Sequence, residues 1–133
     1  MSLPLLRCAA VVACRNEAVL LKEHLPVWIS EGLEIVVIDH SSTDDTRSVA
    51  EAHLGAGVLA VKRMPWLGHF SLDQQLATKA KVIETLDHDW VIHIDADEWL
   101  HSTRKGETLQ EALSRLAAAG ANAVNFEEFV FLP

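Results

Sequence analysis

The segment from Trp90 to Trp99 is an apolar, β-branched run that ends in three carboxylates, Asp95, Asp97 and Glu98. Such runs are typical of parallel strands, which are buried on both faces and need not alternate apolar and polar residues. The acidic cluster then falls at the carboxyl end of a strand, where open α/β sheets bind their ligands. The segment therefore predicts a parallel sheet with a binding site at one edge.

The spacing of Asp95 and Asp97 indicates a metal site. The two residues are two positions apart, so both side chains can face the same side of an extended chain. Neighbouring carboxylates repel each other unless a cation or hydrogen bonds compensate them. Oxygen ligands suit a hard divalent ion, and Mg²⁺ or Mn²⁺ commonly joins carboxylates to substrate phosphates. The alternative is a solvated acidic loop after a core strand.

Short apolar runs alternate with helical patterns along the whole chain. We expect a fifth strand at 123–131 after strands at 8–14, 35–38, 58–61 and 90–94, and helices at 18–29, about 44–54, 72–86 and 109–116. Pro26 should kink or shorten the first helix. This rhythm in 133 residues predicts a single α/β domain, residues 1–133, with a mostly parallel sheet covered by helices on both faces.

Right-handed crossovers would bring the ends of the first, second and fourth strands to one edge of this sheet. Asn16, Asp39 and Asp95 would meet there. Asp39 either accepts hydrogen bonds from a ribose or nucleobase or serves as a turn residue. Asn16 and Glu17 either contact the ligand or cap the first helix. No G-x-G-x-x-G and no P-loop follows the first strand, so a dinucleotide-binding dehydrogenase is disfavoured.

Several other residues are expected to have structural roles. His93 should be a hydrogen-bonded core histidine, and Trp66 and Trp99 should pack at the edge of the site. Lys79 should lie on the polar side of the third helix. Asp44 or Asp45 should cap the second helix.

Composition narrows the partners and the location of the chain. A formal net charge of −8 disfavours binding to the nucleic-acid backbone, which requires basic patches. No signal peptide and no apolar stretch long enough to span a bilayer is recognisable, so the sequence predicts a cytoplasmic protein without a transmembrane segment.

Three motifs resemble the family 2 glycosyltransferases, which have the GT-A fold. They are residues 11–17, residues 37–46 and the acidic turn 94–98, which is similar to the family's D-x-D motif in its D-A-D-E form. The resemblance implies that Asp39 contacts the base of a nucleotide sugar, usually UDP-linked. It also implies that Asp95 lies near the ribose or metal and that Asp97 coordinates Mg²⁺ or Mn²⁺ on the diphosphate.

The resemblance predicts transfer of a sugar from this donor to an unknown acceptor. An inverting enzyme also needs a general base, which the family usually places beyond the fifth strand, in an acceptor-binding half. The chain stops at Pro133, where that half should begin, and Glu98, Glu127 and Glu128 are weak candidates for the base. A non-catalytic donor-binding or structural fragment is the main alternative, and a metal-dependent phosphohydrolase is a third.

The last predicted strand would expose Phe126, Phe129 and Phe131 if no further layer covered it. Exposed apolar patches favour self-association. We therefore expect a homodimer formed through the C-terminal strand.

Overall fold

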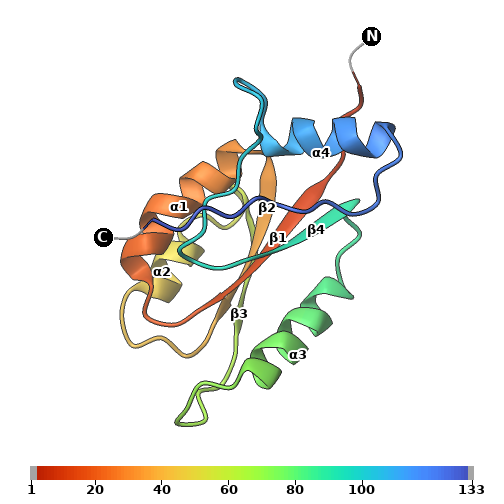
Figure 1. The fold of residues 1–133 in the computed structure, drawn as a ribbon. Coiled ribbons are helices and arrows are strands. Elements are labelled where there is room, and N and C mark those ends of the chain that lie inside the picture. The colour runs from red at the N-terminus through yellow and green to blue at the C-terminus, as the bar shows by residue number, and fades with distance from the viewer. Residues whose placement is uncertain (1–2, 132–133) are drawn as a thin grey trace.

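The computed structural model describes residues 3–131, in which four parallel strands form one sheet (Figure 1). The strands are β1 (Cys8–Cys14), β2 (Leu33–Asp39), β3 (Val58–Arg63) and β4 (Trp90–Ile94), and the helices are α1 (Ala18–Ser30), α2 (Thr46–Glu51), α3 (Leu72–Ile83) and α4 (Leu109–Ala118). The strand order is β3-β2-β1-β4, and every neighbouring pair is parallel. The α/β class expected from the sequence is confirmed.

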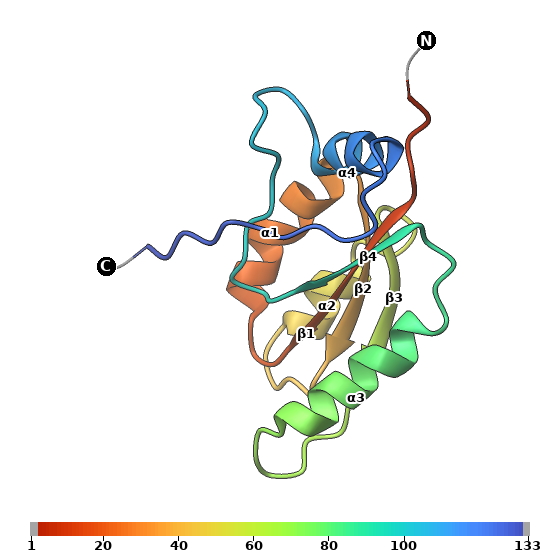
Figure 2. The same cartoon turned by 45° about the vertical axis from the view of Figure 1, so that its right-hand side comes forward.

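Both faces of the sheet are covered, which explains why β1 and β2 have no polar face. Helices α1, α2 and α4 pack on one side and α3 on the other (Figure 2). Val12 of β1 and Val37 of β2 belong to the apolar core on the α1 side of the sheet, together with Leu25 of α1. Val11 of β1 belongs to the smaller apolar core on the other side, together with Val82 of α3. Alternate residues of one strand therefore enter two different cores.

The predicted fifth strand is wrong. The chain has no regular secondary structure from residue 123 to 131, and this segment projects beyond α1 in Figure 2. Glu127 and Glu128 are adjacent, so in a strand of this sheet one of them would face a covered, apolar side. Val124 packs in part against the core, whereas Phe129 and Phe131 are exposed. The structure therefore has no C-terminal strand among residues 123–131 through which the expected homodimer could form.

The ends of the helices also differ from the sequence prediction. Helix α1 continues past Pro26 to Ser30 because Pro26 lies on the exposed side, where water can solvate the carbonyl group that loses its partner. Helix α2 ends at Glu51 rather than near Leu54. Within residues 3–131, none of the helices combines the length and apolar character needed to cross a bilayer.

Candidate functional site

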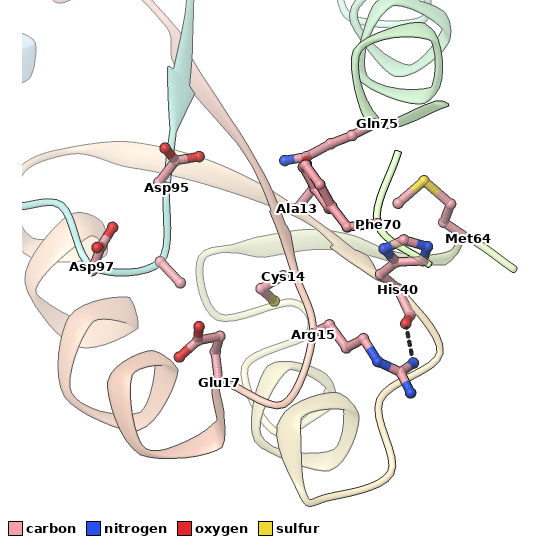
Figure 3. A pocket seen from close by; sticks show the side chains of 11 residues that line it. Ala13, Cys14, Arg15, Glu17, His40, Met64, Phe70, Gln75, Asp95 and Asp97 are labelled. Carbon is pink, nitrogen blue, oxygen red and sulfur yellow. Dashed lines mark hydrogen bonds between the residues drawn. The ribbon is translucent and has the colours of Figure 1, made fainter. Parts of the chain in front are cut away.

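A cavity of about 230 Å³ opens at the carboxyl ends of β1 and β4 and beside the end of β2 (Figure 3). Its walls come from the loops that follow these strands and from the region before and within α3. The lining residues are Ala13, Cys14, Arg15, Glu17, His40, Met64, Phe70, Gln75, Asp95, Ala96 and Asp97. The three strand ends thus meet at one edge of the sheet, and the cavity lies where the topology predicts a ligand.

Asp95 and Asp97 both line this cavity, but they lie on a turn and not on extended chain. The backbone N–H of Asp95 donates to Glu98 Oε2 at 3.0 Å, and the backbone N–H of Glu98 donates to the Asp95 carbonyl oxygen at 3.1 Å. The Glu98 side chain therefore closes the acidic turn, residues 95–98. Asp95 and Asp97 remain exposed, so both carboxylates are available to a ligand.

Two side chains of α1 contact backbone carbonyl groups of the acidic turn. His24 Nδ1 lies 2.6 Å from the carbonyl oxygen of Ala96, and Trp28 Nε1 donates to the carbonyl oxygen of Glu98 at 3.0 Å. Both residues are buried. Neither role was predicted from the sequence, which placed both residues only within the first helix. Their four-residue spacing on the buried side of α1, with a polar atom at each tip, is the signal that could have identified them.

Asn16 connects the loop after β1 to the loop after β2 through hydrogen bonds. It has a positive φ of 54°, and its Oδ1 accepts the backbone N–H of Thr43 at 2.8 Å. The backbone N–H of Asn16 donates to Ser42 Oγ at 2.9 Å. Asn16 is not among the residues that line the cavity, whereas Glu17 is. Neither side chain caps α1, because the cap residue, Glu17, makes no side-chain cap bond.

Asp44 links the beginnings of two helices. Its Oδ1 accepts the backbone N–H of Thr46 at 2.9 Å, in the first turn of α2, and its Oδ2 accepts the N–H of Ala18, at the start of α1, at 3.3 Å. These bonds satisfy N–H groups that the two helices leave unpaired at their N-termini, although the cap residue of α2 is Asp45, which makes no side-chain cap bond. Desolvation alone would raise the pKa of Asp44, but the hydrogen bonds from Thr46 and Ala18 together outweigh it and lower the pKa.

Asp39 is buried at the end of β2, with 2% of its surface exposed. Its Oδ1 accepts the backbone N–H of Ser42 at 3.0 Å, which stabilises the turn after the strand. The turn role considered from the sequence is therefore present. Asp39 itself does not line the cavity, but the next residue, His40, does. Contact with a base or ribose stays a prediction.

The end of the cavity opposite Asp95 and Asp97 is formed by a cation and aromatic rings (Figure 3). Arg15 donates to the carbonyl oxygens of His40, at 2.8 Å, and of Ser41. Its guanidinium carbon lies 4.1 Å from the centre of the Trp66 ring, and the His40 ring meets Trp66 edge-on at 5.1 Å. Trp66 therefore packs, as expected. The role of Arg15 was not predicted, because its partners follow a different strand.

Lys79 is not on the solvent side of α3, as the sequence analysis expected. It is 4% exposed, and its Nζ lies 3.9 Å from Asp95 Oδ1. The prediction that His93 is a core residue is also wrong. β4 is an edge strand, and His93 is exposed on it, although partial burial and then the Lys79 charge lower its pKa. A positive charge thus lies beneath the acidic end of the cavity.

The carboxylates of the cavity could hold a divalent cation only in part. Among residues 3–131 no group of three or more His, Cys, Asp or Glu side chains is arranged as a metal site. Asp95 and Asp97 offer oxygen ligands on one turn, and Glu17 lines the same side of the cavity (Figure 3). Mg²⁺ commonly takes one or two protein carboxylates and completes its shell with water and phosphate. The donor set fits an ion that arrives with a phosphorylated ligand.

The three candidates for a general base lie in different surroundings. Glu98 closes the acidic turn through its carboxylate. Glu127 and Glu128 are exposed in the irregular C-terminal segment and do not line the cavity. The structure does not bring either of them to the site.

Comparison with known proteins defines the class. The chain is 29% identical over 125 residues to the Rhizobium meliloti lipopolysaccharide core biosynthesis glycosyltransferase LpsC, covering 93% of this chain and 42% of that protein. It is 32% identical over 101 residues to an uncharacterised glycosyltransferase of Rickettsia felis, covering 76% of this chain and 32% of the relative. A Rickettsia conorii relative, also named as a glycosyltransferase, is 39% identical over 74 residues, 56% of this chain and 23% of its own length. These similarities relate the chain to glycosyltransferases.

Residues 4–132 match glycosyltransferase family 92, and the chain belongs to that family. The glycosyltransferase class expected from the three motifs is confirmed. The match is to family 92, and a specific relation to family 2 stays a prediction. The chain spans less than half the length of these curated relatives.

Proposed function

We propose that this chain binds a nucleotide-sugar donor together with Mg²⁺ or Mn²⁺ and contributes to transfer of the sugar to an acceptor. The observation that carries the proposal is that Asp95 and Asp97, the D-x-D-like pair, line one cavity whose other end is formed by Arg15 and His40. A metal-dependent glycosyltransferase with a nucleoside-diphosphate donor needs a site of this kind, with an acidic, metal-binding end for the diphosphate and a separate end for the nucleoside.

The orientation of the donor follows from the charges around the cavity. In this proposal Asp97 holds the cation, Asp95 lies near the ribose or metal, and the diphosphate lies at this end. The nucleoside extends toward Arg15, His40 and the turn that Asp39 supports. When bound, the divalent ion neutralises the charge that develops on the diphosphate as the sugar leaves. The acidic turn holds its carboxylates in position before the donor arrives.

The test measures nucleotide binding by calorimetry with UDP, in the presence and absence of Mn²⁺. We expect wild type to bind UDP only with metal, and Asp97→Ala to bind at least about tenfold more weakly. Asp87→Ala is the matched control, because it removes one carboxylate in an exposed ion pair with Arg7, before β4 and away from the cavity. Equal affinity in Asp97→Ala and wild type, or metal-independent binding of UDP, would contradict the proposal.

Recognition of the base or ribose by Asp39 has its own test. Asp39→Asn keeps the shape and an oxygen that can accept the Ser42 N–H. It should weaken UDP binding while leaving the melting temperature nearly unchanged. A large loss of stability with unchanged nucleotide affinity would assign Asp39 to the turn alone.

A second candidate is donor binding without transfer by this chain. It is favoured because the cavity carboxylates among the described residues are Glu17, Asp95 and Asp97, all within the proposed donor site. Among the described residues, the cavity therefore has no further carboxylate that could deprotonate an acceptor hydroxyl. Turnover of UDP-sugars with saccharide acceptors separates the two candidates. Saccharides are tried first because the Rhizobium meliloti relative is named for lipopolysaccharide core biosynthesis. Transfer would require one of these three residues, or Glu98, to act as the base.

A further inference from the structure

Lys79 is a buried cation that the proposed donor site does not yet use. Its side chain extends from α3, and only 4% of the residue is exposed. Among residues 3–131, Asp95 is the carboxylate within 4 Å of its ammonium group, at 3.9 Å. That carboxylate is itself 63% exposed. A buried charge is costly unless it is paired and hydrogen-bonded. A single ion pair at 3.9 Å, with an exposed carboxylate, therefore compensates the charge of Lys79 only in part.

The surroundings of Lys79 locate its charge at the acidic end of the cavity. Gln75, one turn earlier on α3, lines the cavity, as do Cys14 of β1 and Asp95 after β4. The burial of Lys79 and the 3.9 Å between its Nζ and Asp95 Oδ1 place the ammonium group at this end of the cavity. Lys79 therefore lies between the ends of β1 and β4, against the carboxylate proposed to contact the donor or its metal.

We propose that Lys79 makes the binding of a divalent cation and the binding of a nucleoside diphosphate at Asp95 and Asp97 depend on each other. This inference rests on the proposed function. Without nucleotide, the ammonium group already neutralises Asp95 and repels a second cation, so it weakens binding of the metal alone. A diphosphate brings several negative charges, and the same ammonium group then attracts the complex. By linkage, the metal and the diphosphate strengthen each other's binding by the same factor.

Lys79→Met tests the proposal because it keeps most of the side-chain volume and removes the charge. Replacing a buried ion by an apolar group of similar size is often tolerated, and Asp95 can be hydrated once it has lost its partner. Calorimetry should show opposite changes in affinity. Compared with wild type, the variant should bind Mn²⁺ alone at least about threefold more tightly and Mn²⁺–UDP about tenfold more weakly. Lys79→Arg should keep both constants near their wild-type values, as should the control Lys81→Met, which removes an exposed charge from the same helix.

The two opposite shifts distinguish this role from a purely structural one. A site that is only loosened would lose affinity for Mn²⁺ alone and for Mn²⁺–UDP together, and that result would overturn the inference, as would unchanged constants. If Lys79→Met does not fold, as judged by circular dichroism, Lys79→Gln is measured in the same way. Failure of wild type to bind Mn²⁺–UDP would overturn the proposed function and this inference with it. Binding by wild type with no opposite shifts in the variants would overturn the inference alone.

Discussion

The indole Nε1–H of Trp28 donates a 3.0 Å hydrogen bond to the carbonyl oxygen of Glu98, 70 residues later in the chain. Trp28 is fully buried in the core on the α1 side of the sheet. The position of the acidic turn therefore depends on the packing of α1 and not on β4 alone. His24 strengthens the same dependence through the carbonyl oxygen of Ala96.

Trp28→Phe tests whether this support matters for the site. The change removes the indole donor, leaves the Glu98 carbonyl group without it, and reduces the volume of a packed side chain. We expect the free energy of unfolding to fall by about 1–3 kcal/mol and Mn²⁺–UDP binding to weaken. Chemical denaturation and calorimetry measure the two effects.

Trp99→Phe is the matched control, because Trp99 is 65% exposed and Phe keeps an aromatic ring for the edge-on contact with His24, at 5.6 Å. It should change neither quantity by much. A Trp28→Phe protein that is less stable but binds nucleotide like wild type would show that the hydrogen bond stabilises the fold without positioning the site.

Glu98 offers a second prediction, which separates closing the turn from acting as a base. Glu98→Gln retains a carbonyl oxygen to accept the Asp95 N–H, whereas Glu98→Ala leaves that donor without its partner. We expect Glu98→Gln to bind Mn²⁺–UDP nearly as well as wild type and Glu98→Ala to bind more weakly, since the turn is no longer closed. Similar losses in both variants would mean that the charge of Glu98, and not its hydrogen bond, supports the site.

The sequence was sufficient to predict the order of the elements up to α4 and the meeting of three strand ends. Both follow from local patterns, because apolar runs of the β1 type are typical of buried parallel strands and right-handed crossovers fix the edge at which they end. The positions of Asp95 and Asp97 on the cavity follow from the same argument.

The remaining features depend on contacts that no local pattern encodes. Lys79 looks like a surface lysine in the helical pattern of α3, and only the position of α3 against β1 and β4 buries it. His93 was expected in the core because its strand was expected to be buried on both faces, whereas β4 is at the edge of the sheet. The fifth strand was predicted from a weak alternation that ignored the adjacent charges of Glu127 and Glu128.

A third prediction concerns the pH dependence of the loop before α4. Arg115 donates to both carboxylate oxygens of Glu107, at 2.8 and 3.0 Å, and Ser102 donates to the same group. Hydrogen bonds from Arg115, then from Ser102, lower the pKa of Glu107 from 4.5 to about 2. A lowered folded-state pKa contributes stability that is present above pH 4.5 and is lost as the pH falls toward 2.

Glu107→Gln should therefore lower the melting temperature at pH 6 and have much less effect near pH 2, because about half of the native carboxylate is then protonated and most of its contribution to stability is lost. Thermal melts of both proteins between pH 2 and 7 measure the difference. Glu84→Gln is the control, because Glu84 is exposed and caps α3 only through its backbone. A Glu107→Gln effect that is constant over this pH range would contradict the ion-pair explanation.

The last prediction concerns the two free thiols, Cys8 and Cys14, which are buried in the sheet. Burial, followed by nearby carboxylates, raises the pKa of Cys8 to about 11 and that of Cys14 to about 12. The thiolate is the reactive form, so at pH 8 its fraction at Cys14 is roughly a thousandfold smaller than at a thiol with the usual pKa of 9. Iodoacetamide should therefore label the native protein at pH 8 far more slowly than the urea-unfolded protein, as followed by mass spectrometry. Cys8→Ser and Cys14→Ser assign the remaining signal to one thiol. Rapid labelling of native Cys14 would mean that the cavity opens to its base far more than the structure shows.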